Sequence, residues 1–308
     1  MPSNQTPLGA LPARFRRERL LIVGCGDVGQ RAARIVPAKT RLLALTSSTE
    51  RVASLRAQGI TPLVGNLDAP ATLLRLAGIA TRVLHLAPPP SEGWTDPRTL
   101  ALVRALRRRS HPVSLVYAST SGVYGDCAGA WVDETRASHP DTPRARRRVF
   151  AEHYVRFLGR SAGIRTSILR IPGIYAPDRE GGTPHARLRK GTPVLQEPDD
   201  VYTNHIHADD LARACVLAVW RARAQRVYNI NDDTRLKMGD YFDLAADLYQ
   251  LPRPPRVARE GARAQLPVML LSFMSESRRM VNARMKQELG LRLRFATVAQ
   301  GLMERPAP

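Results

Sequence analysis

Short apolar segments alternate with amphipathic segments along most of this chain. Residues 19–23 (RLLIV) form the first apolar run, and a glycine turn and an alternating apolar segment follow it. Runs of this kind predict strands at 19–23, 41–46, 61–67, 81–90, 113–120, 165–175 and 226–232. Periodic apolar positions predict helices at 50–59, 69–78, 99–109, 144–158, 208–223 and near 281–289. Because strand and helix alternate, the pattern predicts an α/β fold with a Rossmann-type doubly wound parallel sheet.

Two stretches break this alternation and predict a second, smaller unit. Residues 176–200 are rich in proline, glycine and charge, and residues 236–308 are irregular. We therefore expect one domain of residues 19–175 plus 201–235, and a small C-terminal domain of residues 176–200 plus 236–308. Residues 1–18 are expected to be a disordered basic tail.

Arginine gives the chain a strongly basic charge. The sequence holds 47 lysines and arginines against 27 aspartates and glutamates, a formal net charge of +20. Such a charge attracts polyanions, so a nucleic-acid-associated role through the basic tail stays open. The arginines are spread along the whole chain, however, so a compositional bias explains the charge as well. No zinc finger, helix-turn-helix or other nucleic-acid motif is visible.

Membrane insertion, secretion and disulfide bonding are not indicated. No apolar run approaches the roughly 18 residues that a membrane span needs, and the N-terminal residues lack the apolar region of a secretory signal. The three cysteines, Cys25, Cys127 and Cys215, form no CxxC pair. We therefore expect a cytoplasmic protein without a disulfide framework or a zinc site, and a homodimer stays open.

A glycine-rich turn follows the first predicted strand. Gly24, Gly26 and Gly29 form the pattern GxGxxG and open a predicted helix. The first glycine allows a tight turn, the second lets the backbone approach a pyrophosphate, and the third lets helix and strand pack closely. This context favours a dinucleotide site, and a glycine turn without a ligand is the alternative.

The residues at the end of the second predicted strand indicate whether NAD or NADP binds. An NAD site usually carries a carboxylate there, to hold the ribose 2′-hydroxyl. This chain has Thr46, Ser47 and Ser48 instead, followed by Arg51. Hydroxyls and a guanidinium suit a 2′-phosphate, so NADP is favoured over NAD. The alternative is that Arg51 only lies on an exposed helix face.

Seven motifs in a fixed order resemble one family. They are GCGDVG, GNLD, HLAPPP, YASTSGVYGD, RIPGIYAP, HIHADDLARA and VYNIND. Over about residues 19–300 the chain resembles the extended short-chain dehydrogenase/reductases, the NAD(P)-dependent sugar epimerase/dehydratase family. The resemblance implies that the larger domain binds NAD(P) and that the smaller one faces the substrate.

The resemblance also implies roles for single residues. Thr120 takes the place of the hydroxyl that hydrogen-bonds the substrate oxygen, and Tyr124 takes a structural place. His207 and Asp210 fall in an architectural link back to the nucleotide domain. The residues implied in cofactor binding are Gly24, Gly26, Asp27, Val28, Gly29, Ser47, Arg51, Asn66, Leu67, Ala87, Pro172 and Ile174.

The chain departs from the family at the catalytic helix. The family pattern there is Tyr-x-x-x-Lys, with a glutamate four residues beyond the lysine. In that register Arg144 stands in the tyrosine position, Arg148 in the lysine position, and Glu152 is the glutamate. Arginine stays protonated and cannot replace the tyrosine in a proton relay.

Helical spacing places Arg144 and Arg148 on one face. There Arg148 could hold the nicotinamide ribose, and Arg144 could bind an anionic substrate or clamp a carboxylate. Arg146 and Arg147 are expected to be solvated. The alternative is that all four arginines lie on the surface.

The function that fits these features is an NAD(P)-binding oxidoreductase or epimerase-like enzyme with a non-standard proton relay. Its substrate is an unidentified carbonyl or hydroxyl compound, and an anionic one would suit the arginines. Asp126, Glu134, Tyr175 and His185 are candidate substitute acids or bases, and the sequence does not choose among them. The alternatives are a catalytically silent NADP sensor and a nucleic-acid-associated protein. No metal site is expected, because the HIHADD segment lacks a third histidine.

Overall fold

The predicted parallel sheet forms the centre of the protein. A computed structural model describes residues 18–304, and the basic tail predicted at residues 1–18 lies outside that range except for its last residue. Seven parallel strands lie in the order β11-β7-β5-β4-β1-β2-β3. They are β1 (Arg19–Val23), β2 (Arg41–Thr46), β3 (Thr61–Val64), β4 (Arg82–His85), β5 (Ser114–Thr120), β7 (Arg165–Ile171) and β11 (Arg226–Asn229). This order confirms the Rossmann-type fold.

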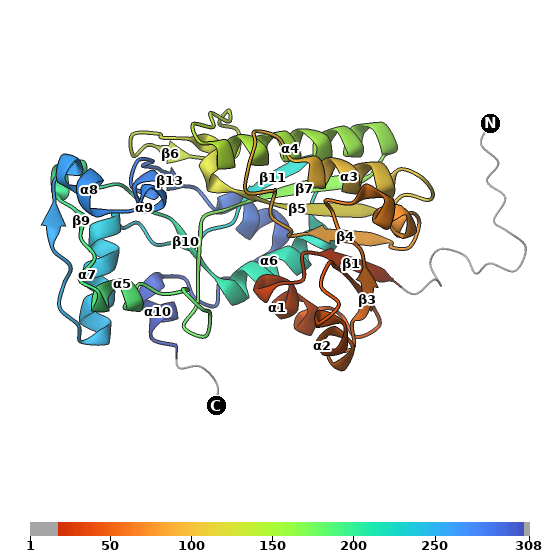
Figure 1. Cartoon of the computed structure of the whole chain (residues 1–308), viewed down its shortest axis with the longest axis horizontal. Coiled ribbons are helices and arrows are strands. Elements are labelled where there is room, and N and C mark those ends of the chain that lie inside the picture. Colours follow the sequence, from red (N-terminus) through yellow and green to blue (C-terminus); the bar gives the residue numbers. More distant parts are fainter. Residues whose placement is uncertain (1–17, 305–308) are drawn as a thin grey trace, which may run out of the picture.

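Helices cover both faces of the sheet (Figure 1). On one face lie α1 (Asp27–Ile35) and α6 (Ala208–Arg221), which pack against each other, with α2 (Arg51–Ala57) beside them. On the other face lie α3 (Pro97–Leu106), α4 (Pro143–Ala162) and the 3-10 helix η2 (Pro70–Leu76). The result is the three-layered arrangement of a doubly wound sheet.

The apolar run of β1 explains why both faces need a helical cover. Leu20 and Ile22 belong to the hydrophobic cluster that includes residues of α1 and α6. Leu21 and Val23 belong to the cluster that includes residues of α3 and α4. All four side chains are fully buried. Since successive side chains of a strand point to opposite faces, a continuous apolar run is what a strand buried on both sides requires.

A third hydrophobic cluster lies beyond the carboxyl ends of the strands, at the left of Figure 1. Its core includes Phe242, Ala245 and Leu302, all buried. The helices in and around it are α5 (His185–Arg189), α7 (Met238–Tyr249), α8 (Arg259–Gln265), α9 (Val268–Phe273) and α10 (Val298–Leu302). The domain boundaries given above stay a prediction.

The remaining elements are short. They are the strands β6 (Trp131–Val132), β8 (Gly173–Tyr175), β9 (Val194–Leu195), β10 (His205–His207), β12 (Arg256–Val257) and β13 (Arg279–Met280), the 3-10 helices η3 (Ser121–Tyr124) and η4 (Glu197–Asp199), and the π-helix η5 (Met285–Leu289). The strands pair as β10-β8, β12-β9 and β13-β6.

Several predicted elements differ from the structure. The helix expected at 69–78 is 3-10, and the helix expected near 281–289 is a single π turn, η5. The strand expected at 61–67 ends at Val64, and the strand expected at 226–232 ends at Asn229, whose side-chain amide donates to the carbonyls of Val132 and Val281. No helix within residues 18–304 is both long and apolar enough to cross a membrane.

Candidate functional site

The three glycines between β1 and α1 have three different surroundings. Gly24 has φ +88°, and a Cβ there would lie 2.4 Å from the backbone nitrogen of Ala87. A Cβ on Gly29 would lie 3.1 Å from the Gly24 carbonyl oxygen and 3.4 Å from Ile22. Around Gly26 a Cβ would meet no atom within 4 Å. Gly24 and Gly29 are therefore required by packing, whereas Gly26 borders open space of the kind that a bound phosphate needs.

Helix α1 begins at this open space without a side-chain cap. Its N-cap is Gly26, and no side chain accepts a hydrogen bond from its first turn. The carboxylate of Asp27 instead forms ion pairs with Arg31 at 2.9 Å and with Arg179 at 3.2 Å. Val28 packs against the cluster of α1 and α6. Free N–H groups and the helix dipole attract an anion. The loop therefore fits the pyrophosphate of a dinucleotide.

Arg51 joins the second strand end to the glycine loop. It is the first residue of α2, and its Nη2 donates a hydrogen bond to the carbonyl oxygen of Cys25. β2 ends at Thr46, whose hydroxyl is bound to the backbone of Ser48, while Ser47 is exposed. The strand end therefore presents hydroxyls and one guanidinium beside the glycine loop.

The other implied cofactor residues lie on neighbouring strand ends. Ala87 is buried against Gly24, and Ile174 packs against the same cluster as Cys25 and Val28. Ile174 lies in β8, and Pro172 comes just before that strand, so this segment is partly strand and not only the expected loop.

Asn66 and Leu67 follow β3. Asn66 is exposed and accepts a hydrogen bond from the backbone of Asp68, while Leu67 packs against the cluster of α3 and α4. Asp68 in turn pairs with Arg98 at 2.6 Å, and Arg98 reaches the carbonyl oxygen of Pro88 at 3.4 Å. The segment after β3 is thus tied to the loop that follows β4.

The arginines of α4 have separate environments. Arg144 is exposed, and Arg146 is exposed and lies over the ring of Trp94, 4.9 Å from its centroid. Arg148 donates to the carbonyl oxygen of Ala118 at 2.7 Å and to the hydroxyl of Tyr117 at 3.1 Å. α4 therefore connects β5 to the loop that contains Trp94.

The prediction that Arg147 is solvated is wrong. Arg147 is only 7% exposed and donates to the carbonyl oxygen of Gly93 at 2.6 Å. The reason is helical geometry: the residues three and four positions after Arg144 are both its neighbours on the helix surface. Arg144, Arg147 and Arg148 therefore share one face of α4.

Thr120 is the last residue of β5 and lies at the carboxyl edge of the sheet. Its hydroxyl accepts a hydrogen bond from the backbone of Gly122 at 3.3 Å, and this capping begins η3. Tyr124, at the end of η3, is buried and donates to Asn229 at 2.8 Å. Thr120 is thus held in a rigid turn that is tied to β11.

The HIHADD segment forms a hydrogen-bonded link. His207, Asp209 and Glu304 place possible ligand atoms within 4.8 Å of one another. His207 Nδ1, however, accepts a hydrogen bond from the backbone of Asp209, so Nε2 carries the hydrogen and faces Glu304 at 3.2 Å. Asp209 is bound by Arg31 at 2.6 Å. Asp210 is fully buried and accepts hydrogen bonds from the backbone of residues 294 and 295.

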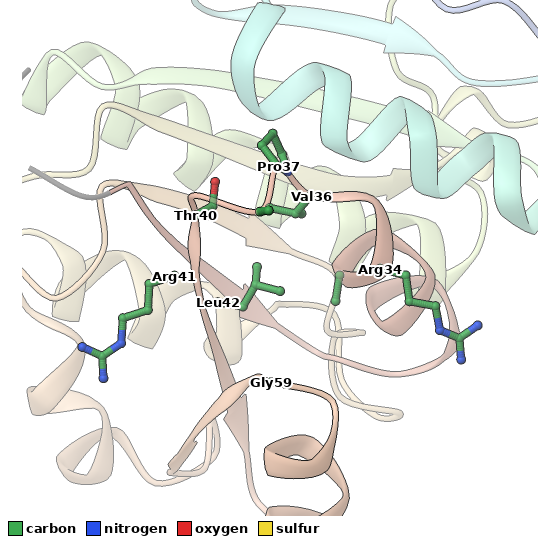
Figure 2. A pocket seen from close by; sticks show the side chains of 9 residues that line it. Arg34, Val36, Pro37, Thr40, Arg41, Leu42 and Gly59 are labelled. Atoms are coloured by element: carbon green, nitrogen blue, oxygen red, sulfur yellow. The ribbon is translucent and has the colours of Figure 1, made fainter.

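A surface hollow of about 500 Å³ lies away from these residues (Figure 2). It is lined by the end of α1, the start of β2 and Gly59, at the amino end of β2. In Figure 2 the side chains of Arg34 and Arg41 extend in opposite directions, so they do not converge on one ligand. The glycine loop lies at the other end of α1.

Comparison with known proteins agrees with this geometry. The model of the NAD dependent epimerase/dehydratase family matches residues 21–231. A conserved protein of unknown function from Silicibacter pomeroyi is 30% identical, with 92% of this chain and 96% of that chain covered and a TM-score of 0.76. UDP-glucuronic acid 4-epimerase from Bacillus cereus, solved in complex with NAD, is 16% identical over 92% of this chain and 96% of that chain, with a TM-score of 0.73.

A curated relative, the putative UDP-glucose 4-epimerase of Methanocaldococcus jannaschii, is 24% identical over 163 residues, which are 47% of this chain. The match spans about half of that relative, 52% of its length. The family model covers most of the chain and includes the glycine loop, β5 and α4. This chain belongs to the NAD-dependent epimerase/dehydratase family.

Proposed function

We propose that this chain is an NADP-dependent oxidoreductase or epimerase-like enzyme that acts on a carbonyl or hydroxyl group of an anionic substrate. When bound, the nicotinamide dinucleotide supplies a hydride to a carbonyl carbon or accepts one from a carbinol. The residues proposed to hold it are Gly24, Gly26, Asp27, Val28, Gly29, Ser47, Arg51, Asn66, Leu67, Ala87, Pro172 and Ile174.

The observation that carries the preference for NADP is the position of Arg51. Its guanidinium is hydrogen-bonded to the glycine loop at Cys25, directly beside a strand end that bears Thr46 and not a carboxylate. A carboxylate at that place would repel a 2′-phosphate, whereas a guanidinium binds one through charge-assisted hydrogen bonds. Ser47, which is exposed, offers a further hydroxyl.

Three residues are proposed to act at the substrate. Thr120 would donate a hydrogen bond to the substrate oxygen. Arg148 is partly buried and is fixed to β5 by two hydrogen bonds, and it would orient the cofactor or the substrate. Arg144 is exposed on the same helical face and would bind an anionic group. UDP-glucuronic acid, named for the Bacillus cereus enzyme, is one substrate of this anionic class.

Arg51→Ala is expected to weaken NADPH binding about 10- to 100-fold and to leave NADH binding within about twofold of the wild type. The reason is that one hydrogen-bonded contact between two charged groups contributes about 1.5–3 kcal/mol. Nicotinamide fluorescence titrations of both variants with both nucleotides measure the change. Arg56→Ala is the control, because Arg56 is an exposed arginine of the same helix. An equal loss of NADPH and NADH affinity would contradict the assignment of Arg51 to a 2′-phosphate.

A further inference from the structure

With arginine in the tyrosine position, another group must exchange a proton with the substrate oxygen. Two of the candidate carboxylates from the sequence form hydrogen bonds with backbone groups. Asp126 accepts hydrogen bonds from the backbone of Ala128 and Ser277. Glu134 is bound by the backbone of Asn229, and its side chain is almost fully buried. Both hold loops in place and have structural roles.

Tyr175 and His185 also make structural contacts. The Tyr175 hydroxyl is buried against α10 and donates to the carbonyl oxygen of Thr297 at 3.3 Å. His185 belongs to α5 and packs against Tyr249, at 5.3 Å between the ring centroids. Both rings thus lie against the third hydrophobic cluster and not at the end of β5.

Tyr117 is a tyrosine that is hydrogen-bonded to an arginine of α4. Its hydroxyl accepts a hydrogen bond from Arg148, but the residue is 0% exposed and its ring belongs to the cluster of α3 and α4. Burial raises the pKa of Tyr117 to about 12. A phenol enclosed in the core cannot reach a substrate at the sheet edge.

Glu276 is a carboxylate that lies near Gly122, as Thr120 does. A Cβ built on Gly122 would lie 3.8 Å from Glu276 Oε2 and 3.7 Å from Thr120 Oγ1. The two oxygens therefore border the same small space, which is left open because residue 122 is a glycine. Glu276 comes from the segment between α9 and β13, far along the chain, and only 12% of its side chain is exposed.

Four charged groups surround this carboxylate. Arg278 donates a hydrogen bond to Oε2, and Arg144 of α4 attracts the carboxylate. Asp141 and Asp126 repel it. Burial, assisted by these two aspartates, raises the pKa of Glu276 above its usual range, against the opposing effect of Arg278. A raised pKa favours the protonated carboxyl group, which can donate a proton to a substrate oxygen.

We propose that Glu276 is the acid–base residue of this site, and that Arg278, which is hydrogen-bonded to it, stabilises its ionised form. The inference rests on the function proposed above. If bound NADPH supplied a hydride from its nicotinamide to a carbonyl carbon, the O–H bond of Glu276 would break as its proton bonded to the substrate oxygen. The carboxylate left behind would be stabilised by Arg278 and would regain a proton from water. Oxidation of a hydroxyl is the reverse.

The test uses the nucleotides themselves, since the substrate is unidentified. Dissociation constants of NADP⁺ and NADPH are measured between about pH 5 and about pH 9 for the wild type and Glu276→Gln. The oxidised nicotinamide is positively charged, so an ionised Glu276 near it favours NADP⁺. We expect the preference for NADP⁺ over NADPH to rise about 3- to 10-fold with pH in the wild type and to stay flat in Glu276→Gln.

Glu197→Gln is the matched control, because it removes an exposed carboxylate that pairs with Lys237. It should keep the wild-type pH profile. An unchanged profile in Glu276→Gln would overturn the role of Glu276 while leaving NADP binding intact. If neither nucleotide binds, the proposed function itself falls and the inference falls with it.

A measurement on the wild type avoids any effect of the substitution on folding. In protein labelled with ¹³C at the glutamate carboxyl, the Glu276 signal, assigned by its loss in Glu276→Gln, should titrate above the usual range of glutamate. It should also shift when NADP⁺ is added. A Glu276 signal that does not respond to NADP⁺ would overturn the proposal.

Discussion

Gly26→Ala is expected to weaken NADPH binding about tenfold or more while leaving the fold intact. The new methyl group would meet no protein atom within 4 Å, and φ at this residue is −81°, a value that alanine adopts freely. It would occupy the space through which a pyrophosphate approaches the backbone. Nucleotide titration and thermal unfolding of the same preparation separate the two effects.

Gly24→Ala should behave differently. Its methyl group would lie 2.4 Å from the Ala87 nitrogen, at φ +88°, so we expect a loss of about 2–4 kcal/mol in the free energy of unfolding as well as a loss of binding. Gly261→Ala is the control for Gly26→Ala, because a Cβ there also meets no atom within 4 Å. Wild-type affinity in Gly26→Ala would show that no phosphate approaches this loop.

Glu152→Ala is expected to lower the free energy of unfolding by about 3–5 kcal/mol, the usual cost of leaving one buried charge without its partner. Glu152 pairs with Arg170 at 2.8 Å, each side chain is 4% exposed, and Ser119 also donates to Glu152 at 2.6 Å. Although burial opposes the charge on Arg170, Glu152 raises the pKa of that guanidinium. Urea unfolding followed by circular dichroism measures the loss.

The paired control is Glu152→Leu combined with Arg170→Met. Removing both charges leaves neither unpaired, so the double variant should be less destabilised than Glu152→Ala. If Glu152→Ala unfolds at the same urea concentration as the wild type, the buried pair does not hold α4 to β7.

Local patterns were enough to predict the sheet and the glycine turn between β1 and α1. The run at residues 20–23 is continuously apolar, as a strand buried on both faces requires, and the glycines follow it directly in sequence. The same kind of reasoning failed at Arg147, where a face was assigned from four-residue spacing alone although three-residue spacing leads to the same face.

Glu276 could not have been found in this way. Its place near Gly122 depends on a contact between segments about half the chain apart, and no periodicity or motif marks it. The four candidate acids chosen from the sequence make structural contacts of their own. Glu276 is likewise bound by Arg278, but it also lies near Gly122 and Thr120.

The most direct measurement is the dissociation constant of the wild-type protein for NADPH and for NADH under the same conditions. Binding of NADPH about tenfold or more tighter than NADH is expected from the guanidinium of Arg51 at the glycine loop. Equal affinities, a preference for NADH, or no binding of either nucleotide would contradict the assignment of this site to NADP.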